Sequence, residues 1–168
     1  MPGLTVVRAR DGALPRTASE RALEAARFGG PDVVRRVVDR ERLLVATTGP
    51  TDYPVEVLRT DGGPVVLDGV VHDLPAGERA AHLREAGAAL RAGDDDALAA
   101  WLAARDGEAI VLAAKGERVA LATDAGGGLP CYRASVGGCE VLTREPRVVR
   151  TLARETGEPL GGDHLGAA

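Results

Sequence analysis

Residues 106–132 read "DGEAIVLAAKGERVALATDAGGGLPCY", and this stretch decides the fold. Two β-like runs, 109–113 and 118–122, flank the turn residues KGE, a pattern typical of a β-hairpin. Three glycines at 126–128 and then Pro130 follow, and another β-like run begins there. A glycine-rich phosphate loop leads into a helix N-terminus. We therefore interpret these glycines as a hairpin corner rather than a phosphate cradle.

The same reading along the whole chain predicts an alternation of strands and helices. Ser19 is the expected N-cap of the first helix, and Gly93 ends the second. The order is strand, helix, several strands, two helices, four strands, helix, which predicts two sheets sandwiched between helices in a four-layer α+β body. We expect one domain over 1–160 and a flexible tail over 161–168. The predicted strands are 4–8, 33–38, 43–47, 55–58, 65–67, 109–113, 118–122, 131–135 and 139–143, and the predicted helices are 18–28, 76–93, 94–105 and 144–155.

The composition excludes several classes of protein. The 168 residues are 45% hydrophobic but only 2% aromatic, so the core must consist mainly of Val, Leu and Ala. The net charge of −4 argues against non-specific nucleic-acid binding. We find no signal peptide and no long apolar segment, so we expect a cytoplasmic protein without membrane contact. Cys131 and Cys139 are the only cysteines, and we expect free thiols and no zinc site.

Several further motifs occur in an order that points to one family. The stretches are FGGPD (28–32), VVLDGVVHDL (65–74), GDDDALAAWL (93–102), the stretch 106–132, and CEVLTREPRVVRTL (139–152). In that order they resemble the N-terminal glutaminase domain of asparagine synthetases, a class II glutamine amidotransferase. The resemblance implies the αββα sandwich of N-terminal-nucleophile hydrolases, and an activity that converts glutamine to glutamate and ammonia.

The residues that such chemistry needs are replaced in this chain. The resemblance implies a Cys nucleophile at the mature N-terminus, where this chain has Pro2, which offers no thiol. It implies an oxyanion-binding Asn, replaced here by Asp68, whose ionised carboxylate cannot donate a hydrogen bond. The stretch that matches the carboxylate-binding Arg segment is ATTGP (46–50), which contains no Arg.

We therefore predict a vestigial pocket in place of an active site. Gly69 and Asp94 match the family pattern, and His72 follows a turn expected at Asp68 and Gly69, so it is expected to line the same pocket. Asp94 has a second interpretation, because an Asp at that point commonly caps a helix. We assign no catalytic residue, no metal and no cofactor. The predicted pocket consists of Pro2, Asp68, Gly69, His72 and Asp94.

These observations favour a non-catalytic partner or regulatory module of an amide-forming synthetase, with that synthetase or a second copy of the chain as its partner. One alternative is an active amidotransferase or amidohydrolase with a non-standard nucleophile such as Cys131, although both cysteines fit core strand positions better. A second is a sensor of amino acids or amines. A third is a tautomerase that uses Pro2 as a base. His82 is expected at the surface of a helix, and Trp101 in the core or at a partner contact.

Overall fold

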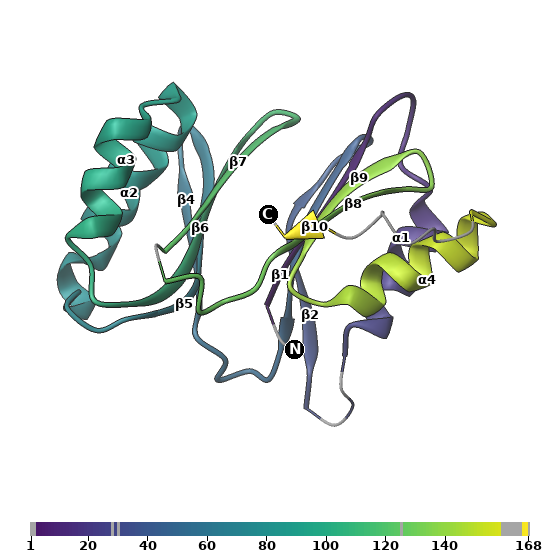
Figure 1. Cartoon of the computed structure of the whole chain (residues 1–168), viewed down its shortest axis with the longest axis horizontal. Helices are drawn as coiled ribbons and strands as arrows, with labels where there is room; N and C mark the ends of the chain where they lie inside the picture. Colours follow the sequence, from purple (N-terminus) through teal and green to yellow (C-terminus); the bar gives the residue numbers. More distant parts are fainter. Residues whose placement is uncertain (1–2, 28, 30, 125, 159–165, 168) are drawn as a thin grey trace. The chain divides into compact units, whose positions relative to one another are not determined.

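The computed structural model describes residues 3–27, 29, 31–124, 126–158 and 166–167. These residues form ten strands and four helices in two antiparallel sheets, and Figure 1 shows the mixed α+β arrangement. The predicted order of elements is confirmed as far as the fourth helix. The elements are β1 (Gly3–Ala9), α1 (Arg16–Ala25), β2 (Val33–Asp39), β3 (Leu43–Gly49), β4 (Val55–Thr60), β5 (Gly63–Val71), α2 (Ala76–Ala92), α3 (Asp95–Ala103), β6 (Gly107–Lys115), β7 (Arg118–Thr123), β8 (Tyr132–Val136), β9 (Cys139–Thr143), α4 (Pro146–Thr156) and β10 (Gly166–Ala167).

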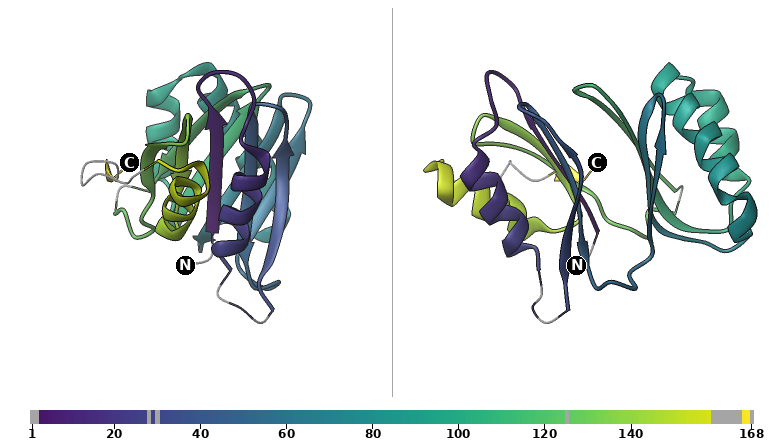
Figure 2. Two further views of the ribbon diagram at one scale, coloured as in Figure 1. Left: turned by 90° about the vertical axis from the view of Figure 1, so that its right-hand side faces the viewer. Right: turned by 180° about the vertical axis from the view of Figure 1, so that it is seen from behind.

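The chain divides into two compact units. The first, Met1–Tyr53 with Pro130–Ala168, holds the six-stranded sheet A in the order β10-β8-β9-β1-β3-β2. The second, Pro54–Leu129, holds the four-stranded sheet B in the order β4-β5-β6-β7. In Figures 1 and 2, α1 and α4 lie together on one face of sheet A, and α2 and α3 lie together on one face of sheet B. Each unit is therefore a helix layer on an antiparallel sheet.

The main core of the first unit lies between sheet A and its helices. Val7 and Val141 from the sheet pack in one cluster with Leu23 of α1 and Val149 of α4. Because side chains alternate along a strand, the neighbours of these residues point to the face of sheet A that lies away from the helices. That second face is also apolar, and it carries Leu4, Val6, Leu43, Val45 and Leu142.

The second unit repeats this arrangement. Leu67 of β5 and Val111 of β6 pack in one cluster with Leu83 of α2 and Trp101 of α3. Trp101 thus lies in the core, which is one of the two places expected for it. The alternate strand positions form a second, largely apolar face of sheet B, which carries Val57, Val66, Ile110, Leu112 and Leu121, and also Asp68.

The capping predictions for α1 and α2 have opposite outcomes. Gly93 ends α2 in the left-handed conformation at φ 69°, as predicted. The prediction of Ser19 as an N-cap is wrong, because α1 already begins at Arg16 and Ser19 is buried inside it. Pro15 precedes the helix with φ −69°, so its ring holds the chain near helical φ one turn earlier than expected.

The hairpin prediction is confirmed for β6 and β7, and the hairpin-corner prediction for the glycines is not. Lys115 pairs with Arg118 across a two-residue turn, and both strands run further than predicted. The glycines at 126–128 do not join paired strands, because β7 belongs to sheet B whereas β8 pairs with β9 in sheet A. They form part of the link between the two units.

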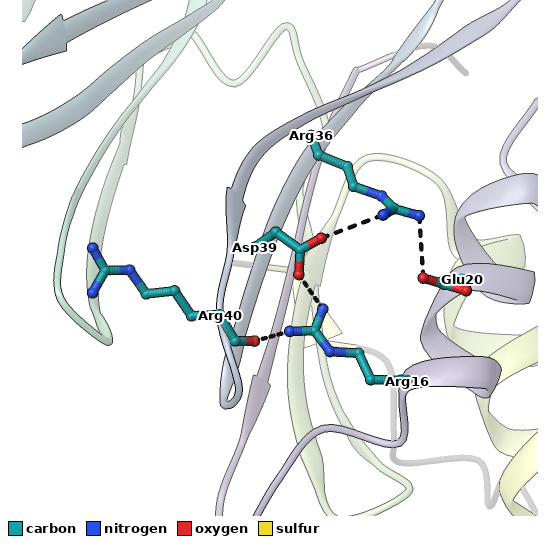
Figure 3. A network of polar contacts seen from close by, with 5 residues as sticks. All are labelled: Arg16, Glu20, Arg36, Asp39 and Arg40. Carbon is teal, nitrogen blue, oxygen red and sulfur yellow. Dashed lines mark hydrogen bonds and ion pairs between the residues drawn. The ribbon is translucent and has the colours of Figure 1, made fainter.

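Exposed ion pairs connect α1 with the edge strand β2, as Figure 3 shows. The Arg16 side chain donates to the Asp39 carboxylate and to the Arg40 carbonyl. Arg36 donates to Asp39 at 3.3 Å and to Glu20 at 3.1 Å. All of these side chains are well exposed, and exposed ion pairs contribute only about 0–1 kcal/mol each. The network therefore orients β2 more than it stabilises the unit.

A second set of ion pairs crosses sheet A around Glu140. Its carboxylate forms ion pairs with Arg8 of β1 and with Arg133 of β8. Partial burial by itself would raise the pKa of Glu140, but the hydrogen bonds and charges of the two arginines outweigh burial and hold the pKa below its usual range. Glu140 consequently favours the folded state in its ionised form.

The predicted tail falls largely outside the described residues, since 161–165 and 168 are not among them. Gly166 and Ala167 pair with Arg133 and Tyr132 of β8. No helix within the described part of the chain is long and apolar enough to cross a membrane.

Candidate functional site

The predicted pocket residues occupy different structural positions, and Pro2 lies outside the described residues. Asp68 is fully buried in the middle of β5, where it pairs with Val55 of β4 and Ile110 of β6. The strand predicted over 65–67 is longer than expected, because β5 continues through Asp68 to Val71. Strand alternation places Asp68 on the face of sheet B that lies away from α2 and α3.

Gly69 has a structural role that depends on its lack of a side chain. Its φ is +118°, and a Cβ atom there would lie 2.2 Å from the carbonyl oxygen of Glu108. Its N–H donates to the Pro54 carbonyl at 2.9 Å. Glycine is therefore required at this position of β5, beside the Glu108 carbonyl of β6.

His72 and Asp94 lie at two surface turns of the same unit. His72 is exposed just after β5, and its N–H donates to the Asp106 carbonyl at 2.7 Å. The Asp94 carboxylate accepts from the Ala97 N–H at 3.0 Å, which confirms the capping interpretation. Asp94 belongs to the helix layer whereas Asp68 points away from it, so the structure does not bring these two carboxylates together.

Polar residues that the sequence analysis missed gather at the start of β1. In the β1–β3 register Gly3 lies opposite Thr48, whose hydroxyl donates to the Gly3 carbonyl at 3.4 Å. The hydroxyl oxygens of Thr5 and Thr143 are 2.8 Å apart, and both residues are almost completely buried. We call this set the β1-start cluster. Its members are Thr5, Thr48, Thr143, Arg144 and Glu145.

Arg144 and Glu145 complete the cluster where β9 leads into α4. The Arg144 N–H donates to the Leu4 carbonyl at 3.1 Å, and its guanidinium donates to the Tyr53 hydroxyl. The Glu145 N–H donates to the Thr143 hydroxyl at 3.0 Å, and its carboxylate accepts from the Arg147 N–H at 3.0 Å. Arg144 and Glu145 are only 5% and 6% exposed, so each charge depends on these contacts.

The acidity of Glu145 reflects its surroundings. Burial is the largest single influence and would raise the pKa of Glu145, but the hydrogen bonds to its carboxylate, those from Arg147 among them, together hold the pKa below its usual range. The cluster therefore combines buried hydroxyls, a guanidinium and a carboxylate. One sequence signal could have revealed it, namely three consecutive polar residues, Thr143 to Glu145, directly after an apolar strand.

The two cysteines do not resemble activated nucleophiles. Cys139 packs in the core of the first unit, and burial raises the pKa of its thiol. Cys131 is also buried, directly before β8, and no disulfide joins the pair. Reactive cysteines usually have a lowered pKa and some exposure. Among the described residues, no group of three or more His, Cys, Asp or Glu side chains is arranged to hold a metal ion.

Comparisons with known proteins place few constraints on this site. No family model and no curated protein matches the chain. Among solved structures, the chain is similar to glutamine phosphoribosylpyrophosphate amidotransferase from B. subtilis, in complex with ADP and GMP. The match has 12% identity and a TM-score of 0.49, and it covers 99% of this chain and 48% of that chain. The chain thus spans about half the length of that protein. A likeness of this strength does not define a family, and the resemblance to asparagine synthetases stays a prediction.

Proposed function

We propose that the protein is a glutaminase-like module without hydrolytic activity, which acts in the cytoplasm as a partner or regulatory module of an amide-forming synthetase. One observation carries the proposal. The ATTGP stretch (46–50), which the resemblance assigns to carboxylate binding, lies in β3 opposite the start of β1. It contains no Arg, and the hydroxyl of its Thr48 donates to the Gly3 carbonyl at 3.4 Å.

These substitutions remove the separate requirements of the reaction. A threonine hydroxyl cannot provide the charged, two-pronged contact that an arginine makes with a carboxylate. An ionised Asp68 offers no hydrogen-bond donor to an oxyanion, and the loss of one such donor typically slows catalysis by about 100–1000-fold. Pro2 has no thiol with which to attack the amide. These replacements argue against hydrolysis, and binding is the role that we propose in its place.

The proposal includes the four-layer αββα arrangement. Helices cover only one face of each sheet, yet the second faces of both sheets carry apolar residues such as Val6, Val45, Val66 and Leu112. An apolar sheet face is stable when another apolar surface packs against it. We propose that the second faces of sheets A and B, which are both apolar, pack against each other. Methyl NOEs between the two sets of residues are expected, and their absence in an assigned spectrum would contradict this arrangement.

Ammonia release is the direct test of the missing activity. We expect no release from glutamine or asparagine above that of a heat-denatured sample. Release by the native protein that disappears in Asp68→Asn or Cys131→Ala would overturn the proposal and support an amidohydrolase with another nucleophile. The partner is tested separately, by whether the tagged chain retains an amide-forming synthetase that lacks its own glutaminase domain.

The buried carboxylate of Asp68 supports a second candidate, a sensor of amines or amino acids. A carboxylate prefers a cationic ligand, so amines and amino acids are expected to raise the thermal unfolding midpoint, whereas dicarboxylic acids are not. Asp68→Asn should abolish the shift, and Asp94→Asn should not, because Asp94 is a helix cap. A screen without any stabilising amine would exclude this candidate.

A further inference from the structure

The edge strands of the two sheets differ in how well they are protected against pairing. β2, at one edge of sheet A, carries Arg35 and Arg36 and has an irregular register between Arg36 and Val38. β4, at one edge of sheet B, carries Glu56 and Arg59. Charged residues and bulges of this kind discourage strand-to-strand association. β7, the other edge of sheet B, has no charge, proline or bulge between Arg118 and Thr123.

The outer edge of β7 presents backbone groups in a regular pattern. The two-residue turn makes Lys115 and Arg118 a hydrogen-bonded pair, so even-numbered residues of β7 direct their backbone groups toward β6. The Asp124 N–H continues this pattern by donating to the Ala109 carbonyl at 3.1 Å. Val119, Leu121 and Thr123 consequently direct their N–H and C=O groups outward, where no described strand pairs with them.

Two opposite charges border this edge without partners. The exposed Arg118 side chain has no hydrogen bond or ion pair among the described residues. The Asp124 side chain has none either, and its Oδ1 atom is buried without a hydrogen-bond partner. The two residues lie six positions apart, symmetrically about Leu121. An unpaired buried carboxylate oxygen is costly, so this edge is incomplete as it stands.

We propose that β7 pairs antiparallel with β7 of a second copy of this chain, about a two-fold axis at Leu121. In this register Arg118 of each copy lies opposite Asp124 of the other. The dimer therefore contains two Arg118–Asp124 ion pairs, and neither charge is left without a partner. Leu121 faces its own copy, and Val119 faces Thr123, as hydrogen-bonded pairs. The two four-stranded sheets B become one continuous sheet, and the exposed edge disappears.

The side-chain geometry favours this register over its neighbours. Because Leu121 and its copy form a hydrogen-bonded pair, Arg118 and Asp124 form a non-hydrogen-bonded pair, in which side chains approach more closely. A shift by two residues would place Arg118 opposite Ala122 or Gly126 and lose both charge pairs. The inference is independent of the proposed function, because it uses only the edge of sheet B.

Light scattering coupled to size exclusion tests the pairing directly. The monomer has a mass of 17.3 kDa, and we expect the mass to rise toward twice that value with concentration. Leu121→Pro removes an outward N–H and should leave the protein monomeric. The matched control is Val57→Pro on β4, where the two-residue turn between Thr60 and Gly63 likewise directs the Val57 N–H outward. This control should still form dimers.

Charge exchange tests the register. Arg118→Asp or Asp124→Arg alone converts two attractive pairs into two repulsive ones and should weaken the dimer by about tenfold or more. Combining Arg118→Asp with Asp124→Arg should restore the original dissociation constant. Circular dichroism confirms that each variant is folded, and both positions tolerate charge because they already carry it. A monomer at every concentration, a dimer unaffected by Leu121→Pro, or a double variant as weak as the single ones would overturn the proposal.

Discussion

Replacing Thr143 by Val isolates the contribution of the β1-start cluster. Valine has nearly the same shape, so no cavity forms, but the hydroxyl that contacts Thr5 at 2.8 Å and accepts from the Glu145 N–H at 3.0 Å is lost. Two polar groups then remain buried without partners. Each such group costs about 1–3 kcal/mol, so the loss of partners for two groups should lower the free energy of unfolding of Thr143→Val by about 2–6 kcal/mol.

The companion variants give this reasoning its test. Thr5→Val leaves the Thr143 hydroxyl bonded to Glu145 and should cost only about 1 kcal/mol. The double variant no longer buries a lone Thr5 hydroxyl, so it should be no less stable than Thr143→Val. The control is Thr151→Val in α4, where the residue is 7% exposed and its hydroxyl has no hydrogen bond among the described contacts, so the change should cost under about 1 kcal/mol.

Urea unfolding followed by circular dichroism measures all four variants. The decisive quantity is the coupling between Thr5 and Thr143, expected at about 1–2 kcal/mol. Strictly additive costs would refute a direct hydroxyl contact. A Thr143→Val variant as stable as the control would refute the role of Thr143 as an acceptor for the Glu145 N–H.

Three further predictions follow from individual contacts. Gly69→Ala should destabilise the protein by more than about 3 kcal/mol, because the new Cβ would meet backbone atoms. At Gly116 a new Cβ meets nothing within 4 Å, so Gly116→Ala should cost only about 1 kcal/mol. Thermal unfolding compares the two variants. The folded pKa of Glu140 is lowered, so its contribution to the free energy of unfolding is present above the unfolded pKa of about 4.3 and is lost as pH falls through the folded pKa. Glu140→Gln should therefore flatten the decline of stability in acid. Urea unfolding between about pH 2.5 and 7 measures this decline. Iodoacetamide should modify Cys131 and Cys139 far more slowly in the native protein than in urea, because both are buried and burial raises the Cys139 pKa; rapid native labelling, read by mass spectrometry, would argue for a reactive thiol.

Local signals in the sequence were sufficient for the order of elements. Gly93 ended α2 as predicted, because glycine adopts the left-handed conformation that a helix C-terminus requires. The β6–β7 hairpin was also predictable, since the turn at Gly116 separates two β-branched runs. The prediction of Ser19 as the N-cap was wrong because the sequence offers two start signals for α1. The helix begins at Arg16, directly after Pro15, and Ser19 lies inside it.

Long-range contacts could not be predicted from local patterns. Thr5 and Thr143 are 138 positions apart, and only the pairing of β1 with β9 brings their hydroxyls together. The glycines at 126–128 were assigned to a hairpin because a strand follows them, yet which sheet that strand joins depends on β9. In both instances the outcome depended on the order of strands in the sheet, which a local window of about ten residues does not determine.

Two residues of the predicted pocket, Gly69 and Asp94, match the glutaminase pattern, but their contacts give each of them a structural role. Gly69 matches the glutaminase pattern, but the approach of β5 to β6 alone requires a glycine there. Asp94 matches as well, but its carboxylate caps α3. Neither match therefore counts as evidence of retained chemistry, because selection for the fold alone would preserve both. The departures from the pattern stand at position 2, in the stretch 46–50 and at Asp68. This division between matching and departing positions is what the proposed binding role without hydrolysis predicts.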